Sequence, residues 1–327
     1  MQYTILGKTN LHVSRIGFGA WGIGGGAPKL RWADMWKADD AKSKQSLMKA
    51  YELGINLFDT ALVYGDGHSE RLIAEVLKGK DIVVVTKVPP KNMHWPALST
   101  YDIKDVFPKD HVIEKTHESF KNLGNRTIDV LLLHVWTDSW IDKDDWRQAF
   151  SELKKEGIVK FIGVSVNDND PDSVLKLAQS NEVDVIEIVY NIFDQQAADK
   201  LTPLCKKNKI GIIARVPLDE GSLSGTFTYE TTFNDWRKDY FTKERLKITV
   251  DRVNEIKNKL VTPHRTITQI ALKFAISENG ADATITGMRN PDHVLENVKS
   301  VDIELTDEEM EYLRSQRWIR NFYPPDV

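Results

Sequence analysis

The sequence has 327 residues, of which 41% are hydrophobic and 28% charged, which suits a large globular core and excludes a disordered chain. Its net charge of −4 and its lack of a long Lys/Arg run argue against nucleic acid as a partner. The longest strongly apolar stretch, residues 128–135, is too short to span a membrane, residues 1–10 lack a signal-peptide core, and the single Cys205 permits no internal disulfide, so we expect a cytoplasmic protein.

Brief β-branched runs alternate with longer amphipathic stretches along the chain. Residues 1–14 come first, with alternating polarity over 3–6 and a turn at 7–10, which predicts a β-hairpin. Eight later runs are almost continuously apolar, as expected for parallel strands covered on both faces. These predicted strands are residues 16–20, 56–59, 82–86, 129–134, 161–164, 185–189, 211–215 and 283–286.

A helix is predicted after each of these strands. The predicted helices are residues 40–53, 70–77, 111–123, 144–155, 172–179, 199–207, 266–276 and 291–298. Eight strand–helix pairs favour an α/β fold closed into a (β/α)8 TIM barrel over an open sheet. We expect residues 1–327 to form one barrel domain, with a long loop at 218–246 after the seventh strand and a C-terminal helical tail that begins near Thr306.

Four titratable residues are expected at one end of this barrel, because active sites of such barrels lie where the strands end. Asp59 ends the second predicted strand, Lys87 follows the third, and His134 ends the fourth. Tyr64 lies five residues beyond Asp59 in a glycine-containing turn. Singly, these residues have ordinary structural explanations, such as a helix cap, a loop lysine or a core histidine. Their joint position at the ends of adjacent strands favours catalysis.

The four residue types form a coherent proton-transfer system. A phenol is a poor proton donor at neutral pH, and an adjacent ammonium lowers its pKa. We therefore expect Lys87 to acidify Tyr64, and Asp59 to keep Lys87 charged. His134 is expected to orient the substrate oxygen or to share its proton. Such a donor suits a carbonyl oxygen that becomes negative during hydride addition.

Several segments of the chain resemble motifs of the aldo-keto reductase superfamily. They are residues 54–65 (GINLFDTALVYG), 86–87 (TK), 131–134 (LLLH), 16–21 (IGFGAW) and 163–165 (GVS). The similarity runs from residue 6 to about residue 298. It implies that Asp59, Tyr64, Lys87 and His134 are the catalytic residues, with Tyr64 as the general acid.

The cofactor site is expected at the end of the eighth strand. The chain lacks a Gly-x-Gly-x-x-Gly after a strand, so a Rossmann site is not indicated. Residues 287–291 (GMRNP) instead lead into a helix whose N-terminus favours a phosphate, and Arg289 favours NADPH over NADH. The resemblance implies an NADP(H) site whose pyrophosphate-binding belt is residues 217–225. Its implied contacts are Ala20, Trp21, Ser165, Asn167, Glu187, Arg215, Val216, Pro217, Leu218, Gly221, Ser222, Leu223, Gly287, Met288, Arg289, His293, Glu296 and Asn297.

Three positions of this site depart from the family pattern. Many members have Ser-Asn at the nicotinamide carboxamide, whereas this chain has Ser165 and Asn167 separated by one residue. Glu187 stands where glutamine is frequent, and Arg215 where an aromatic ring usually stacks on the nicotinamide. A guanidinium can also stack on a flat ring, and we expect Arg215 to pair with Glu187.

Tryptophans in the loops are candidates for the wall of the substrate pocket. Trp21, Trp136 and Trp140 fall in loops expected to rim the barrel mouth, with Trp32 and Trp36 as further candidates, although core packing is an equal alternative for each. The acidic run 167–172 lacks the glycine and glutamate of an EF-hand loop, so we expect helix capping there and no metal site.

The favoured function is NADPH-dependent reduction of an aldehyde or ketone, or the reverse oxidation of an alcohol or sugar. Two alternatives stay open. One is a cofactor-binding regulatory subunit resembling potassium-channel β subunits, and the other is a barrel lyase that uses Lys87 as a Schiff-base amine. The expected partner is a small-molecule carbonyl or alcohol. The sequence names no particular substrate and sets no oligomeric state.

Overall fold

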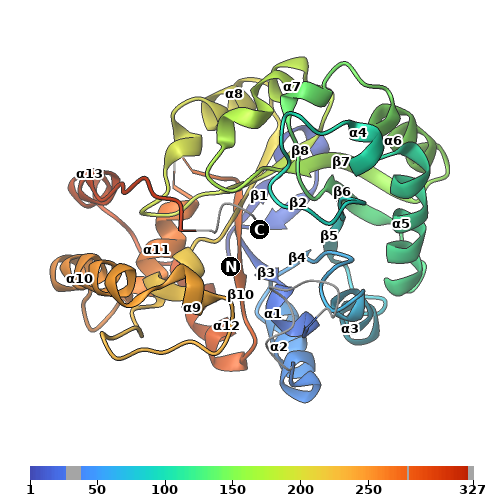
Figure 1. Cartoon of the computed structure of the whole chain (residues 1–327). Coiled ribbons are helices and arrows are strands. Elements are labelled where there is room, and N and C mark those ends of the chain that lie inside the picture. The colour runs from blue at the N-terminus through green and yellow to red at the C-terminus, as the bar shows by residue number, and fades with distance from the viewer. Residues whose placement is uncertain (27–37, 278–279, 323–327) are drawn as a thin grey trace.

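The computed structural model describes residues 1–26, 38–277 and 280–322. Its centre is a closed barrel of parallel strands in the order β10-β3-β4-β5-β6-β7-β8-β9, so the first and last strands, β3 and β10, pair to close it (Figure 1). The TIM-barrel prediction is therefore confirmed. The strands are β3 (Ile16–Gly19), β4 (Leu57–Asp59), β5 (Val83–Val88), β6 (Ile128–Leu133), β7 (Val159–Ser165), β8 (Val185–Val189), β9 (Gly211–Arg215) and β10 (Ala283–Gly287).

The predicted N-terminal hairpin is also confirmed. Strands β1 (Tyr3–Ile5) and β2 (His12–Ser14) pair antiparallel across the short turn η1 (Gly7–Thr9). Leu6 and Val13 of this hairpin are fully buried and belong to the same apolar cluster as residues of the barrel interior. The hairpin thus plugs the barrel at the end where its strands begin.

Helices surround the barrel and cover its outer apolar face (Figure 1). Within the described residues they are α1 (Trp21–Gly24), α2 (Asp40–Glu52), α3 (His68–Val76), α4 (Ile103–Val106), α5 (Lys109–Asn122), α6 (Asp145–Lys155), α7 (Leu175–Ser180), α8 (Leu201–Lys207), α9 (Arg237–Tyr240), α10 (Lys243–Leu260), α11 (Ile267–Ala275), α12 (Pro291–Val298) and α13 (Asp307–Ser315). Asn290 caps α12 as its position before a proline suggests, by accepting a hydrogen bond from the Asp292 amide. In this part of the chain, each helix is either too short or too polar to cross a bilayer.

The segment predicted as one long loop, residues 218–246, contains more regular structure than expected. It begins with the 3-10 segment η5 (Asp219–Ser224), includes α9, and ends inside α10. Helix α10 buries Leu246, Val250, Val253, Ile256 and Leu260, whose spacing of three or four residues is that of one helical face. The helix was missed because charged residues occupy most of the positions between these five.

The barrel interior explains how the fold places polar side chains at one end. Side chains of a strand alternate between its faces, so every second residue points inward. The lower interior layers are apolar and include Leu57, Val85, Leu132, Val185 and Ile213, which are buried. Each of these apolar residues is followed two positions later by a polar one. In the same order, these polar residues are Asp59, Lys87, His134, Glu187 and Arg215. The uppermost interior layer is therefore polar, and all of its members except His134 are ionisable groups of ion pairs.

Candidate active site

Lys87 is the centre of this charged layer. Its side chain is fully buried, and its Nζ donates hydrogen bonds to both carboxylate oxygens of Asp59, at 2.7 and 2.6 Å, and to the Thr60 carbonyl at 3.0 Å. Glu187 Oε2 lies 3.3 Å from the same nitrogen. A lysine inside a barrel is thus held between two carboxylates, which compensate its loss of hydration.

The ionisation of this cluster follows from its burial. Burial disfavours a charged lysine, but Asp59 and Glu187 outweigh this effect and raise the pKa of Lys87 above its usual value. Burial, followed by repulsion from Glu187, raises the pKa of Asp59 well above its usual value, although Lys87 opposes both effects. Lys87 therefore keeps its proton at neutral pH, as expected from the sequence.

Tyr64 lies beside this lysine, in the turn between β4 and α3. The Lys87 Nζ is 5.5 Å from the centroid of the Tyr64 ring. Burial raises the pKa of Tyr64 to about 12, and Lys87 lowers it only in part. The expectation that Lys87 makes the phenol more acidic than usual is therefore wrong in its net sign. The ammonium acts in the expected direction, but loss of hydration is the larger effect.

His134 directly follows β6 and packs between two aromatic rings. Its ring lies edge-on to Tyr64, with centroids 6.0 Å apart, and edge-on to Trp95, with centroids 5.6 Å apart. Burial, Lys87 and Arg215 lower the pKa of His134 well below its usual value. Its Nδ1 is buried without a hydrogen-bond partner among the described residues. A neutral imidazole here can orient a substrate oxygen, but it is a poor source of a second proton.

Arg215 joins the cluster from the opposite side of the barrel. Its Nε lies 3.7 Å from Glu187 Oε1, which confirms the predicted pairing. Its Nη2 donates to Asp168 Oδ1 at 2.6 Å and to the Val166 carbonyl at 2.8 Å. Asp168 comes from the run that we expected to cap a helix, and its ion pair with Arg215 was not anticipated. Ser165 Oγ donates to Glu187 at 3.2 Å, which completes the network.

The residues expected at the nicotinamide carboxamide have other partners in this structure. The Asn167 amide pairs with the backbone of Ala97, accepting from its N–H and donating to its carbonyl, both at 3.0 Å. These two hydrogen bonds fix the loop that carries Trp95, whose ring faces His134. Sequence reasoning missed Trp95, because only the fold brings its loop to the barrel mouth.

The tryptophans divide between the mouth and the core. Trp136 and Trp140 are 0% and 1% exposed, and their indole N–H groups bond to Asp138 and to the Tyr101 carbonyl. They therefore pack in the core and do not rim the mouth. Trp21 is half-buried, and its ring lies 6.3 Å from that of Trp236 in the long connection after β9. Trp32 and Trp36 lie outside the described residues.

The segment after β10 offers an open, positively charged corner. Gly287 and Arg289 are exposed, and no described heavy atom lies within 4 Å of where a Gly287 Cβ would be. The aliphatic part of Arg289 packs on Gly22, where a Cβ would come within 2.8 Å of it. This contact joins the loops after the last and first barrel strands. Burial disfavours a charged Asp235, yet Arg237 and, more weakly, Arg289 lower its pKa below the usual value.

The other predicted cofactor contacts differ in accessibility. His293 is exposed on the first turn of α12, whereas Glu296 accepts a hydrogen bond from Thr266 at 2.7 Å. Several predicted contacts have buried side chains. These buried residues are Ala20, Pro217, Ser222, Leu223, Met288 and Asn297.

The protein-family model described as "Aldo/keto reductase family" matches residues 15–317, which is most of the chain. The chain belongs to the aldo-keto reductase family. A relative named "NADH-specific methylglyoxal reductase", from Escherichia coli, is 28% identical over 96% of this chain and 98% of its own length. A protein of Schizosaccharomyces pombe named as a putative voltage-gated potassium channel β subunit is 26% identical over 100% of this chain and 95% of its own.

Solved structures of aldo-keto reductases share the architecture. The holo form of an aldo-keto reductase from Bacillus halodurans superposes with a TM-score of 0.75 at 25% identity, covering 98% of this chain and 97% of that one. A thermostable aldo-keto reductase in complex with the inhibitor epalrestat gives a TM-score of 0.71 at 26% identity, covering 97% of this chain and 100% of that one. The cluster of charged residues at the barrel mouth is consistent with membership of this family.

Proposed function

We propose that this protein reduces an aldehyde or ketone with NADPH, with Tyr64 as the general acid and Asp59, Lys87 and His134 as the other catalytic residues. The observation that carries this proposal is the buried ammonium of Lys87 beside the Tyr64 ring, held by Asp59 and Glu187. The carbonyl oxygen becomes negative as hydride adds to its carbon. A phenol beside a permanent positive charge is suited to protonate that oxygen.

The residues divide the work of proton transfer. Tyr64 keeps its proton at neutral pH because its pKa is about 12, so it is in the acid form that reduction requires. Lys87 favours the phenolate that forms when the proton leaves, and Asp59 keeps Lys87 charged throughout. His134, neutral and next to Tyr64, supplies a ring nitrogen that can hydrogen-bond to the substrate oxygen.

The corner around α12 fits a dinucleotide phosphate. The exposed Arg289, the open space beside Gly287 and the N-terminus of α12 together provide a forked cation, room and helix N–H groups. A bound nicotinamide dinucleotide would supply the hydride. Arg289 supports NADPH through its fit to a 2′-phosphate, whereas the name of the Escherichia coli relative describes the opposite preference.

Replacing Tyr64 with phenylalanine tests the catalytic assignment. The Tyr64→Phe variant should bind the dinucleotide as the wild type does and lose at least about a hundredfold in carbonyl reduction, because the acid is removed while the ring stays. Tyr229→Phe, on the exposed surface, is the matched control and should keep full activity. Wild-type rates in Tyr64→Phe would show that Tyr64 is not the acid.

Replacing Arg289 with leucine tests the nucleotide preference. If Arg289 binds a 2′-phosphate, the ratio of kcat/KM for NADPH to that for NADH should fall by roughly tenfold, because a charge-assisted contact is lost. Lys299→Leu removes a cation at the other end of α12 and should leave the ratio unchanged. A wild type that strongly prefers NADH would overturn the NADPH part of the proposal alone.

A regulatory role is the second candidate, since relatives named as potassium-channel β subunits match almost the whole chain. It predicts tight dinucleotide binding with negligible turnover. Consumption of NADPH and NADH against aromatic aldehydes, sugars and dicarbonyls separates the two roles. The lyase alternative is disfavoured because Lys87 is held protonated. Borohydride would trap a covalent substrate adduct only if Lys87 formed a Schiff base.

A further inference from the structure

The C-terminal segment after α13 crosses the loops that follow β8 and β9. The Trp318 amide donates to the Phe193 carbonyl at 2.9 Å, which fixes this tail against the loop after β8. Gln195 in the same loop donates to the carbonyl groups of Leu313 and Arg314 at the end of α13. The tail is therefore attached before it reaches the loop after β9.

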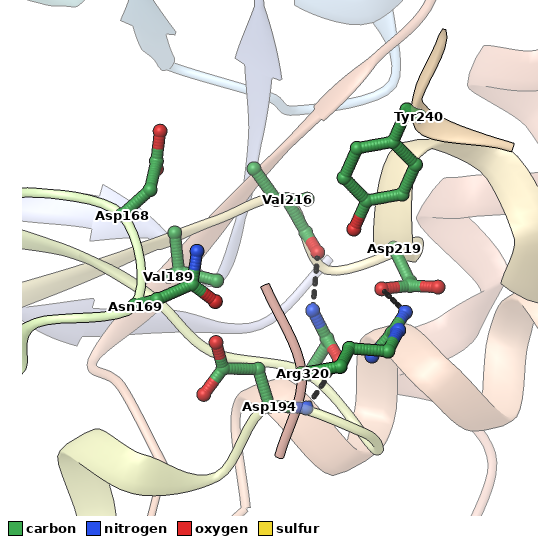
Figure 2. Close-up of a pocket in the computed structure, with 9 residues that line it drawn as sticks. Asp168, Asn169, Val189, Asp194, Val216, Asp219, Tyr240 and Arg320 are labelled. Atoms are coloured by element: carbon green, nitrogen blue, oxygen red, sulfur yellow. Dashed lines mark hydrogen bonds and ion pairs between the residues drawn. The ribbon is translucent and has the colours of Figure 1, made fainter. Parts of the chain in front are cut away.

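Arg320 of this tail points into the pyrophosphate-binding belt, residues 217–225 (Figure 2). Its guanidinium forms an ion pair with Asp219, and both side chains are nearly buried, with 6% and 4% exposed. The other oxygen of Asp219 accepts a hydrogen bond from Ser222 Oγ at 2.6 Å. A cavity of about 20 Å³, lined in part by Asp219 and Arg320, remains beside this ion pair and has room for one water molecule.

The belt needs an external support of this kind. Asp219 and Glu220, and Val216 directly before the belt, have positive φ angles of 48°, 54° and 55°, a conformation that is unfavourable for residues other than glycine. Such a backbone persists only where surrounding contacts hold it. Ser222 ties Asp219 within the belt, and Arg320 ties it to the tail.

The charge of the belt is a second reason why it needs support from outside. Asp219 and Glu220 place two carboxylates in the segment that is expected to bind a pyrophosphate, which is itself an anion. A buried, unpaired carboxylate at Asp219 would repel that ligand. Arg320 neutralises Asp219 without belonging to the belt.

We propose that Arg320 is a positioning residue for the dinucleotide: it neutralises Asp219 and fixes the belt in its binding conformation. This inference rests on the proposed function. The Arg320 side chain is itself preorganised, because its guanidinium lies 4.4 Å from the Trp318 ring centroid and 5.1 Å from that of Phe322. Arg252 and Arg245 of α10 stack on these two rings, at 4.6 and 4.7 Å. The tail thus packs between α10 and the belt.

The test compares two arginines of the same tail. Arg320→Ala should raise the Kd of the apoprotein for NADPH by about fivefold or more, a typical size for coupling between a support and a site. Arg317→Ala removes an ion pair with Asp199, at 2.7 and 2.5 Å, away from the belt, and should leave the Kd unchanged. Hydrogen exchange of the 218–225 amides, without nucleotide, should be faster in Arg320→Ala than in Arg317→Ala.

A rescue experiment separates this role from a general loss of stability. Asp219→Asn in the Arg320→Ala background removes the unpaired carboxylate and should restore part of the affinity. Equal Kd values for wild type and Arg320→Ala, with equal exchange at the belt, would overturn the inference. A wild type that binds neither NADPH nor NADH would instead contradict the proposed function.

Discussion

The charged centre of the barrel and the belt at its rim both hold a buried ion pair, but they are built in different ways. Lys87, Asp59 and Glu187 project from three strands whose pairing fixes their backbone. Asp219 and Arg320 belong to a turn and a tail that are 101 residues apart, and side chains hold them together. The centre is rigid because of the barrel, whereas the rim depends on individual contacts.

This difference separates two tasks of a reductase. The atoms that move a proton need a fixed geometry, which a closed barrel provides. A dinucleotide must enter and leave, so the elements around it are drawn from less stable parts of a structure. Substitutions at the centre should therefore change both stability and chemistry, and substitutions at the rim should mainly change binding.

The largest effect is expected at Lys87. Lys87→Met leaves the buried Asp59 without a countercharge and Glu187 with Arg215 alone, which should lower the free energy of unfolding by about 3–5 kcal/mol. It should also reduce kcat/KM at least about a hundredfold. Lys154→Met is the control, because its pair with Asp184 is partly exposed and should contribute at most about 1 kcal/mol. Urea unfolding of both variants would refute the comparison if their losses were equal.

The second effect concerns the core tryptophans. Trp140→Phe removes a buried indole and its 2.8 Å hydrogen bond to Tyr101, so we expect a loss of about 1–3 kcal/mol of stability with an unchanged KM. Trp21→Phe, at the mouth, should instead change KM and leave the stability almost unchanged. Thermal unfolding and steady-state kinetics measure both quantities. A higher KM in Trp140→Phe at unchanged stability would show that Trp140 does line the substrate pocket.

Glu187 allows a smaller, electrostatic test of the centre. Its negative charge raises the pKa of Tyr64, in addition to the effects of burial and of Asp59, so Glu187→Gln should lower that pKa. In the proposed mechanism, reduction requires the protonated phenol of Tyr64, so the loss of activity at alkaline pH should move to lower pH in the variant. Stability should change by about 1 kcal/mol. Glu182→Gln, which breaks the exposed pair with Arg147, should leave the pH profile of kcat/KM in place.

The smallest effect is expected at Glu309 in α13. The hydrogen bond from Arg265 lowers the pKa of Glu309 from 4.5, against partial burial. A carboxyl with a lowered folded-state pKa stabilises the fold above its unfolded pKa, and this contribution is lost as the pH falls through the folded value. Glu309→Gln keeps the capping box of α13, costs at most about 1 kcal/mol at neutral pH, and should flatten the decline of stability below pH 4.5.

Glu308→Gln, at the exposed neighbouring position, should retain the wild-type decline. Urea unfolding at several pH values between about 3 and 6 distinguishes the two variants. Identical slopes for wild type and Glu309→Gln would show that the ion pair with Arg265 does not contribute to stability.

Residues on strands could be predicted from the sequence because two local rules place them. Apolar runs mark parallel strands, and alternation continues the inward face of each strand to its last residue. Asp59, Lys87 and His134 follow from these rules. Glu187 and Arg215 were identified instead as departures from the family pattern, and the structure pairs them. The hairpin at the N-terminus followed equally from its alternating polarity.

Loop residues could not be predicted in the same way, because their positions depend on contacts between distant segments. Asp168 was expected to cap a helix and instead pairs with Arg215. Trp136 and Trp140 lie in loops by sequence, yet they pack behind the strands with Trp146 and Phe107. The acidity expected for Tyr64 had the wrong net sign because burial of the ring depends on the neighbouring loops.

The pairing of β10 with β3 also bears on how the chain is made. The barrel strand β3 ends at Gly19, whereas its second neighbour begins only at Ala283. During translation, one edge of β3 therefore stays unpaired until almost the whole polypeptide, including β10, has been synthesised. An open strand edge is a template for intermolecular pairing. This edge is thus an aggregation risk during synthesis, and premature termination before residue 283 would leave it without its β10 partner.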